Sequence, residues 1–294
     1  MKVITACNPP PIAYSLPRDA IPAWACDSHC HVTPADYANV TPDASYHPAP
    51  APPEELDRMR EAIGLRRSVV VQASVYGLDN RGVEAALKRD PRNVRGVVVA
   101  DRHVSDRQLD IWHTLGVRGM RFIMAGQLGG TVGMDDLQSL APRLAARGWH
   151  AEIMLRPEQW GRLLPDLRSL QCNLVIDHLG GVPAEDKDPI PDAAILSLLG
   201  EGNTWLKLIG YRLSSDLLHP HLIDRARRFY EAAPTRMVWG TDWPHVGMAD
   251  RHDAGVLLDA FMQWFDGDSK VLEKVLASNP EKLFDFETTA ASAG

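Results

Sequence analysis

Two histidines near the start of the chain have the spacing of a chemical site. They stand in the segment Asp27-Ser28-His29-Cys30-His31, which ends a short apolar run. Because side chains alternate between the two faces of a β-strand, His29 and His31 are expected to project to the same side. Two adjacent imidazoles can bind a divalent metal ion or polarise a carbonyl group. Alone, such a pair is equally compatible with two buried histidines that bond to the backbone.

Two later apolar runs also end in polar residues. The run at 173–179 ends in Asp177 and His178, and the run at 237–243 ends in Asp242. A buried polar group at the end of an apolar strand needs a partner or a function, and perturbed polar groups gather at functional sites. Since successive residues of a regular strand face opposite sides, we expect His178 to face inward with the other imidazoles. Asp177 is then expected to orient a neighbour or to face the helix layer.

The elements that must position these residues are short apolar runs that alternate with amphipathic segments. The runs begin at intervals of roughly 25–40 residues, close to the size of one βα unit. The predicted strands are 24–30, 67–74, 94–100, 117–124, 150–155, 173–179, 204–210 and 237–243.

Eight such units predict an α/β fold, a (β/α)8 TIM barrel in a single domain over residues 24–286. The three polar strand ends then meet at the carboxyl-terminal mouth of the barrel, where such enzymes place their chemistry. An open doubly wound sheet is the alternative, and it is disfavoured because no GxGxxG or P-loop follows any run. Residues 1–23 are expected to form an irregular N-terminal arm, and 287–294 a frayed tail. The proline-rich stretch 41–53 is expected to form a long loop over the mouth.

Composition narrows the functional classes. The 294 residues are 45% hydrophobic and 23% charged, and the net charge of −7 provides no general attraction to nucleic acid or anionic membranes. The four cysteines have no CxxC spacing, which argues against a zinc ribbon or a disulfide scaffold. No run reaches the roughly 20 apolar residues of a membrane span, and the N-terminal segment lacks a long apolar run after its basic start. We therefore expect a cytoplasmic protein, and the sequence leaves a homo-oligomer open.

Several motifs, taken together and in order, resemble the amidohydrolase superfamily and most closely its branch of lactone hydrolases. The segments that carry the resemblance are DSHCH, VVVQASVYGLDN, GVRGMRF, VIDHLG, WLKLIGYRL, WGTDWPH and the terminal NPEKLF. The resemblance implies an (α/β)8 barrel and the hydrolysis of a ring ester. It places the site at His29, His31, His178 and Asp242.

Lactone opening assigns a role to each of these residues. Water must lose a proton, and Asp242 is the expected general base. His29, His31 and His178 are expected to stabilise the carbonyl oxygen, either directly or through a bound metal. If a metal is present, the same four residues are its ligands. The resemblance supports one zinc ion and no metal equally, since members of this branch work without a metal whereas sugar-lactonase relatives bind zinc.

Residues that read the substrate are expected around the same mouth. Arg121 and Arg212 end the fourth and seventh predicted strands, and guanidinium forks bind carboxylates at two points. By resemblance, both match positions that hold substrate carboxylates, and Tyr46 matches a substrate-contacting tyrosine. The partner is thus expected to be a small anionic lactone of the pyrone, muconate or sugar-acid type. Further candidates are the polar residues after the second strand and one histidine after the eighth, namely Ser74, Tyr76, Asn80 and His245.

Two departures from a dicarboxylate-hydrolysing member of the branch concern a second carboxylate anchor. That member has a further basic residue where this chain reads Ile123-Met124-Ala125-Gly126-Gln127, and a tyrosine where this chain has Met154. A monocarboxylate or polyhydroxylated lactone is therefore the better expected fit. Lys207 is expected to be a structural or substrate-contacting cation. Seven other histidines lack a matching pattern and are expected at the surface or at helix caps: His47, His103, His113, His150, His219, His221 and His252.

Three other functions use the same pattern. A lactone isomerase would move the acyl group between hydroxyls at the same site. A metal-dependent decarboxylase usually has a further catalytic histidine near the seventh strand, and WLKLIGYR has none. A binding protein without activity is the third, because a fold alone does not establish catalysis.

Overall fold

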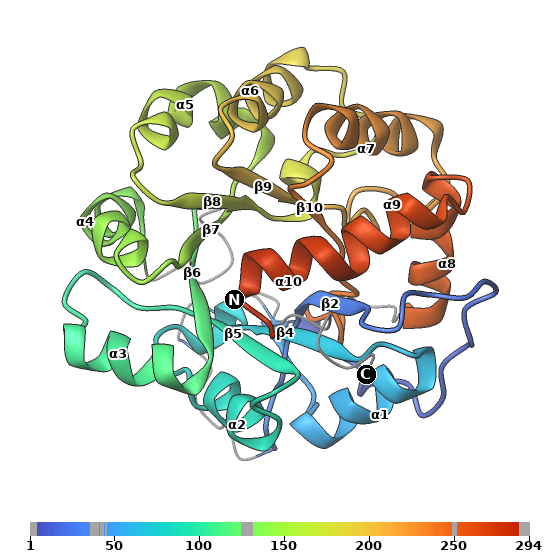
Figure 1. The fold of residues 1–294 in the computed structure, drawn as a ribbon, viewed down its shortest axis with the longest axis horizontal. Helices are drawn as coiled ribbons and strands as arrows, with labels where there is room; N and C mark the ends of the chain where they lie inside the picture. The colour runs from blue at the N-terminus through green and yellow to red at the C-terminus, as the bar shows by residue number, and fades with distance from the viewer. Residues whose placement is uncertain are drawn as a thin grey trace, which may run out of the picture.

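Eight parallel strands form the centre of the computed structural model, which describes residues 5–35, 41, 44, 46–124, 132–248 and 252–287 (Figure 1). Consecutive strands pair in the order of the chain, as a barrel of βα units requires. Their valine-rich sequences suit strands that are covered on both faces. The strands are β2 Cys26–Cys30, β4 Arg67–Val71, β5 Val94–Val98, β6 Val117–Ile123, β7 His150–Met154, β8 Asn173–Ile176, β9 Thr204–Lys207 and β10 Met237–Val238.

The barrel closes between β2 and the segment that follows β10. Backbone nitrogen atoms of Ser28 and His31 donate to the carbonyl oxygens of Trp239 and Trp243, at 2.9 and 2.6 Å. Gly240 makes this approach feasible, because a Cβ there would lie 2.6 Å from the backbone nitrogen of His29. The predicted (β/α)8 barrel is therefore confirmed, and the open doubly wound sheet is excluded.

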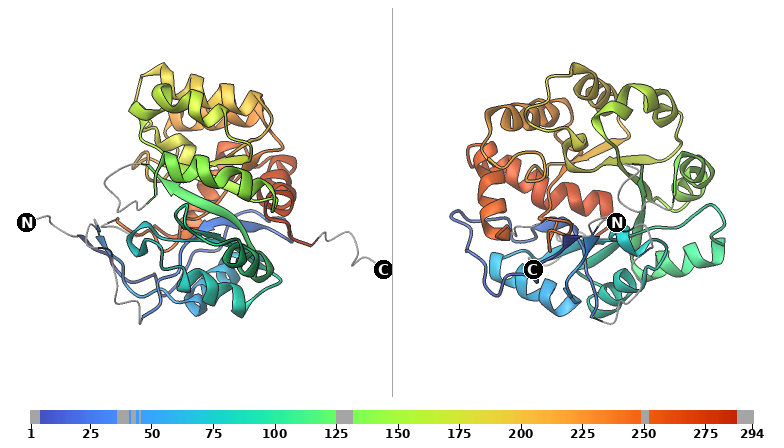
Figure 2. Two further views of the ribbon diagram at one scale, coloured as in Figure 1. Left: turned by 90° about the vertical axis from the view of Figure 1, so that its left-hand side faces the viewer. Right: turned by 180° about the vertical axis from the view of Figure 1, so that it is seen from behind.

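Helices surround the strands on all sides (Figure 2). Those between successive strands are α1 Pro53–Ile63, α2 Arg81–Arg89, α3 Asp106–Leu115, α4 Met134–Ala145, α5 Trp160–Arg168, α6 Pro189–Gly200 and α7 Pro220–Ala232. After β10 come α8 Ala254–Trp264, α9 Ser269–Glu273, the π-helical turn η4 Lys274–Ser278 and α10 Asn279–Phe284. Short 3-10 turns are η1 Ser74–Tyr76, η2 Pro157–Gln159 and η3 His178–Gly181.

Local sequence fixes the ends of these helices. The hydroxyl of Ser105 accepts a hydrogen bond from the backbone nitrogen of Gln108 and caps α3, which ends at Gly116 with φ 113°. Asp188 and Asp253 cap α6 and α8 through their side chains. Among the described residues, none of the helices combines the length and apolar character that crossing a bilayer requires.

The last helix covers the amino-terminal end of the barrel (Figure 1). Leu283, Phe284 and Phe286 pack against residues of six strands, namely Cys26, Val69, Val71, Val97, Val175, Trp205 and Val238. Arg67 ties α10 to β4 by donating to Glu281 at 3.0 Å. This end is therefore closed mainly by apolar side chains.

His150 lies inside the barrel next to this apolar end. Its side chain is 1% exposed, and its ring meets the ring of Phe284 edge-on at 5.5 Å. The space that it fills is left by Gly119, where a Cβ would lie 2.3 Å from Nε2 of His150. The expectation that His150 lies at the surface or at a cap is therefore wrong, because it is the first residue of an inward-facing row on β7.

The opposite end of the barrel is covered by loops. A two-stranded sheet joins β1 Thr5–Ala6 to β3 Tyr46–His47, and the N-terminal arm continues over α8, where the backbone of Ser15 donates to Asp253 at 2.9 Å. Parts of the predicted loop 41–53 and arm, and the predicted tail beyond Glu287, lie outside the described residues.

Candidate active site

A cavity of about 180 Å³ opens at the carboxyl-terminal mouth of the barrel. Its wall combines two arginines, two imidazoles and one carboxylate with a few apolar side chains. The lining residues are His31, Tyr46, Ser74, Arg121, Ile123, Met154, His178, Arg212, Asp242, Val246 and Gly247. Such a mixture of apolar wall and convergent polar groups is typical of a small-molecule site.

Asp242 has one fixed oxygen and one oxygen that accepts no hydrogen bond. Its Oδ2 accepts from the hydroxyl of Tyr211 at 2.7 Å and from Nε of Arg212 at 2.5 Å. Its Oδ1 is buried and has no hydrogen-bond partner among the described residues. Asp242 itself has a φ of 56°, in the left-handed region, where aspartate occurs more often than most residues. The carboxylate is thus held from behind, with a single oxygen directed at the imidazoles.

The charge state of Asp242 follows from its neighbours. Burial alone would raise the pKa of its carboxyl group, but the positive charge of Arg212 and the nearby histidines together outweigh burial and hold this pKa well below its usual value. The carboxylate is therefore ionised at neutral pH.

Asp27 secures the backbone that carries Asp242. Its carboxylate accepts from the backbone nitrogen of Thr241 at 2.9 Å and from the Thr241 hydroxyl at 2.5 Å. It also accepts from the backbone nitrogen of His29 at 3.1 Å. Burial raises the pKa of Asp27 to about 6. One buried side chain therefore joins the first and last strands directly below the site.

The two histidines of β2 both approach Oδ1 of Asp242, as their alternation predicts. Nε2 of His31 lies 3.0 Å from this oxygen, and Nε2 of His29 lies 3.5 Å from it. Nδ1 of His31 lies 2.7 Å from the carbonyl oxygen of Val71, so this nitrogen carries a proton. His31 lines the cavity, whereas His29 is fully buried beneath it.

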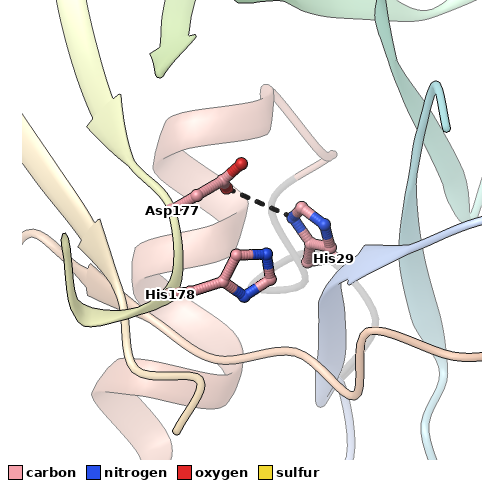
Figure 3. A group of neighbouring side chains, drawn as sticks. All are labelled: His29, Asp177 and His178. Atoms are coloured by element: carbon pink, nitrogen blue, oxygen red, sulfur yellow. Dashed lines mark ion pairs between the residues drawn. The ribbon is translucent and has the colours of Figure 1, made fainter. Parts of the chain in front are cut away.

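Asp177 and His178 both point into the barrel, which corrects the prediction that only one of them would. Figure 3 shows the two side chains turned toward His29, whose Nδ1 lies 3.3 Å from Oδ1 of Asp177. The alternation rule fails here because β8 ends at Ile176, and His178 then adopts a φ of 46°. Burial lowers the pKa of His178 to about 4, so that its imidazole is neutral at neutral pH.

A layer of buried charges lies directly under the cavity. Arg121 donates to Asp177 through Nε at 3.0 Å and Nη2 at 2.8 Å, and Nζ of Lys207 donates to Glu152 at 2.5 Å. The side chains of Asp177, Glu152 and Lys207 are 0% exposed and that of Arg121 is 4% exposed. Burial alone would raise the pKa of Asp177, but Arg121 and Lys207 hold this pKa well below its usual value.

The metal-ligand side chains do not surround a single point. They form two groups that share His29, one with Asp177 and His178 and the other with His31 and Asp242, each with ligand atoms within 4.8 Å of one another. The first group already contacts the ammonium of Lys207, 3.4 Å from Oδ1 of Asp177. A tetrahedral zinc bound by His29, His31, His178 and Asp242 would need all four in one group. The four predicted ligands therefore do not fit a single zinc site.

The structure brings most of the predicted site residues to one place. Tyr46 and Ser74 share the cavity wall with both arginines, and their hydroxyl oxygens are 3.3 Å apart. Three predicted substrate contacts do not line the cavity: Tyr76, Asn80 and His245. The Asn80 side chain instead donates to the carbonyl of Val99 and accepts from its backbone nitrogen. Residues 125–127, in the segment where the dicarboxylate-hydrolysing relative has a further basic residue, lie outside the described residues.

Sequence analysis missed three residues that matter for the site. Glu152 and Asp27 are carboxylates inside apolar strands, and a buried charge in such a run is itself a signal for a partner. Tyr211 stands beside Arg212 in the GYRL motif and shares its hydrogen-bond acceptor, Asp242. Nothing in its spacing distinguishes it from a core aromatic residue.

Comparisons with known proteins show to which family the chain belongs. The amidohydrolase family model matches residues 26–286. The chain is 33% identical to a 2-pyrone-4,6-dicarboxylate hydrolase of Comamonas testosteroni over 289 residues, 92% of this chain and 93% of the relative. It is 30% identical to a 4-sulfomuconolactone hydrolase of Rhizobium radiobacter, over 93% and 92% of the two chains. It is 26% identical to a D-galactarolactone isomerase of Agrobacterium fabrum, over 94% and 96%. The chain belongs to the amidohydrolase family.

Proposed function

We propose that this protein hydrolyses the ring ester of a small lactone that carries an acidic group. The observation that carries the proposal is the state of Asp242. It is an ionised carboxylate in the cavity wall, with Oδ2 bound by Tyr211 and Arg212 and with Oδ1 buried and without a hydrogen-bond partner among the described residues. A carboxylate held in this way can accept a proton from a water molecule in the cavity.

The reaction follows from the position of that oxygen. Oδ1 of Asp242 takes one proton from water while the water oxygen bonds to the lactone carbonyl carbon, and the carbonyl oxygen becomes negatively charged. The tetrahedral intermediate then expels the ring oxygen, which takes the proton back from Asp242. One C–O bond forms and one breaks, and the product is a hydroxy acid.

His31 is placed to assist both steps. Its Nδ1 donates to the carbonyl oxygen of Val71, and its Nε2 lies 3.0 Å from Oδ1 of Asp242. The proton that Oδ1 takes from water can therefore be shared with Nε2 of His31, close to the carbonyl oxygen as its negative charge develops. Removal of a preorganised donor from such a position typically lowers kcat by about 100- to 1,000-fold.

Two arginines support an acidic substrate. Arg121 uses Nε and one N–H of Nη2 on Asp177, the second N–H of Nη2 on the sulfur of Met154 and one N–H of Nη1 on the carbonyl of Gln72, so among the described residues one N–H group remains. Arg212 uses Nε on Asp242 and one N–H of Nη2 on Val246, so three N–H groups have no partner among the residues that the structure describes. Both side chains line the cavity and can bind a carboxylate while they keep their structural partners.

The size and the remaining wall favour a single ring with one acidic group. The cavity volume of about 180 Å³ is below the roughly 300–1,000 Å³ of sites for larger ligands. Ile123 and Met154 contribute apolar surface to the same cavity wall. The relatives named for pyrone dicarboxylate and sulfomuconolactone support an anionic lactone.

Acyl migration is a second candidate, and the relative named as a galactarolactone isomerase favours it. In that reaction a hydroxyl of the substrate replaces water as the nucleophile at the same carbonyl. Turnover in ¹⁸O-labelled water separates the two, because hydrolysis incorporates one labelled oxygen into the new carboxylate and migration incorporates none.

The test of the proposal is Asp242→Asn, assayed on pyrone, muconate-type and sugar-acid lactones. We expect kcat to fall by about 100- to 10,000-fold, the range for loss of a general base, with little change in substrate affinity. Asp266→Asn is the matched control, since Asp266 also has a left-handed φ, 53°, but is exposed and paired with Arg227. Near-normal turnover by Asp242→Asn would remove Asp242 as the base.

A further inference from the structure

Lys207 is a fully buried lysine that the proposed reaction does not use directly. It stands at the end of β9, under the floor of the cavity, and does not belong to the cavity wall. A buried ammonium is costly unless each of its protons finds an acceptor. Its contacts therefore indicate what it does.

Three acceptors surround the ammonium of Lys207. Its Nζ lies 2.5 Å from Oε2 of Glu152, 2.7 Å from Nδ1 of His29 and 3.4 Å from Oδ1 of Asp177. An ammonium has three N–H donors and no lone pair, so all three contacts run from Lys207 outward. The contact with His29 is the one that has a chemical consequence.

Donation by Lys207 decides which nitrogen of His29 carries the ring proton. Nδ1 must supply a lone pair to accept from Lys207, so in a neutral imidazole the proton lies on Nε2. A proton on Nδ1 would instead place two donors 2.7 Å apart.

The protonated nitrogen faces the proposed base. Nε2 of His29 lies 3.5 Å from Oδ1 of Asp242 and has no hydrogen-bond partner among the described residues, so its N–H lies beside the oxygen that is to act on water. In the other tautomer a lone pair would face that carboxylate oxygen at the same distance. The two tautomers therefore affect the reacting oxygen in opposite ways.

We infer that Lys207, held by Glu152, is a positioning residue that fixes the Nε2-protonated tautomer of His29 and thereby orients Oδ1 of Asp242. The inference rests on the proposed function for its effect on turnover, whereas the tautomer is a property of the free protein. It also gives Glu152 a role, because this carboxylate, 0% exposed, holds the ammonium against His29.

The direct test is ¹⁵N NMR of the imidazoles in the wild-type protein at neutral pH. Protonated and unprotonated ring nitrogens have well-separated shifts, and the His29 signals are assigned by their loss in His29→Gln. We expect Nε2 of His29 to be protonated and Nδ1 unprotonated. A proton on Nδ1 would overturn the inference, and this result does not depend on any substrate.

The variant test removes the donor without leaving a lone buried charge. In Lys207→Met with Glu152→Gln, one cation and one anion are lost together, and we expect the His29 proton to move to Nδ1, toward Asp177. We expect kcat to fall about 10- to 100-fold, as when a residue that orients a reactive histidine is removed, with KM changed less than about two-fold. Wild-type kcat, or an unchanged tautomer, in the folded double variant would contradict the inference.

Arg95→Met is the matched control for the loss of a buried cation. Arg95 is 7% exposed, and its guanidinium donates to the carbonyls of Pro91 and Asp285, away from His29. The substitution Arg95→Met should lower the stability of the fold and leave both the His29 tautomer and kcat unchanged. If the double variant does not fold, the wild-type spectrum alone decides the inference. Inactivity of the wild-type protein on every lactone would count against the proposed function and leave the spectrum unaffected.

Discussion

The two ends of the barrel are closed by side chains of opposite character. At the amino-terminal end, Leu283, Phe284 and Phe286 fill the opening with apolar surface. At the carboxyl-terminal end, the side chains of His29, His178 and Asp242 each keep a buried polar atom that has no hydrogen-bond partner among the described residues. The amino-terminal end thus stabilises the fold, whereas the buried polar groups at the carboxyl-terminal end destabilise it and remain available for chemistry.

The charged layer between the two ends makes this contrast possible. Arg121, Asp177, Glu152 and Lys207 pair with one another inside the barrel, so two positive and two negative charges balance. Above them the cavity can hold an ionised Asp242, because Arg212 supplies its counter-charge from the side. Below them the opening is filled by apolar side chains, and the charges of Arg67 and Glu281 at that end pair with each other.

The largest expected effect is on the apolar end. Phe284→Ala should lower the free energy of unfolding by about 3–5 kcal/mol, because it leaves a cavity among buried side chains. Urea unfolding measures this loss, and kcat of the folded variant at low temperature should equal that of the wild type. Ile111→Ala, at a side chain that is 50% exposed, is the control and should change the unfolding free energy by less than about 0.5 kcal/mol. A large fall in kcat in folded Phe284→Ala would contradict the separation of the two ends.

The second-largest expected effect is a loss of stability at acidic pH, caused by the buried histidines at the carboxyl-terminal end of the barrel. Burial lowers the pKa values of His29 and His178 to about 3 and about 4, from an ordinary value of 6.5. Below pH 6.5 these two histidines are therefore protonated in the unfolded chain but still neutral in the folded protein. Their contribution to the free energy of unfolding is full above pH 6.5 and is lost as the pH falls toward the lower pKa values. Each of the two histidines should lower the free energy of unfolding by about 1.5 kcal/mol between pH 6.5 and pH 5.

Other buried groups modify this pH dependence in known directions. Asp27, with its pKa raised to about 6, gains a proton in the folded state and offsets about 1 kcal/mol over the same window. Burial lowers the pKa of His150 and adds to the loss. Asp177 and Asp242 have pKa values held well below the usual range, so they change the free energy of unfolding only below about pH 4.

The expected net loss between pH 6.5 and pH 5 is about 2 kcal/mol, measured by urea unfolding at both pH values. His178→Asn should reduce the loss by about 1.5 kcal/mol, since the variant has one less buried imidazole. His103→Asn, at an exposed position, should leave the pH dependence unchanged. Stability that rises as the pH falls across this window would show that the imidazoles are not held neutral.

Much of the fold could be predicted because its signals are local. Valine-rich runs such as those at β4 and β5, separated by amphipathic segments, are sufficient to predict eight βα units in order. The site residues could be found because His29, His31, His178 and Asp242 each follow or end such a run. The barrel then requires these ends to meet, whatever the distances between them.

The remaining features depend on contacts that sequence spacing does not reveal. The inward direction of both Asp177 and His178 depends on β8 ending at Ile176, a boundary that alternation cannot locate. Glu152 and Lys207 pair with each other although they stand 55 residues apart in the chain, on different strands. The burial of His150 depends on the space above Gly119, on a neighbouring strand.

The smallest expected effect isolates one hydrogen bond at the reactive end. Tyr211→Phe removes the hydroxyl that donates to Oδ2 of Asp242 at 2.7 Å, while Arg212 still binds the same oxygen. We expect kcat to fall by about 5- to 10-fold, which corresponds to about 1–1.4 kcal/mol of activation free energy. Because the lost bond favours the ionised form, the pKa of Asp242 should rise and the acidic limb of kcat/KM should move to higher pH. Tyr230→Phe, at a half-buried tyrosine that packs on Phe265, is the control. If Tyr211→Phe left both kcat and the acidic limb unchanged, Arg212 alone would hold the carboxylate, and the reactive end would depend on one charged partner instead of two.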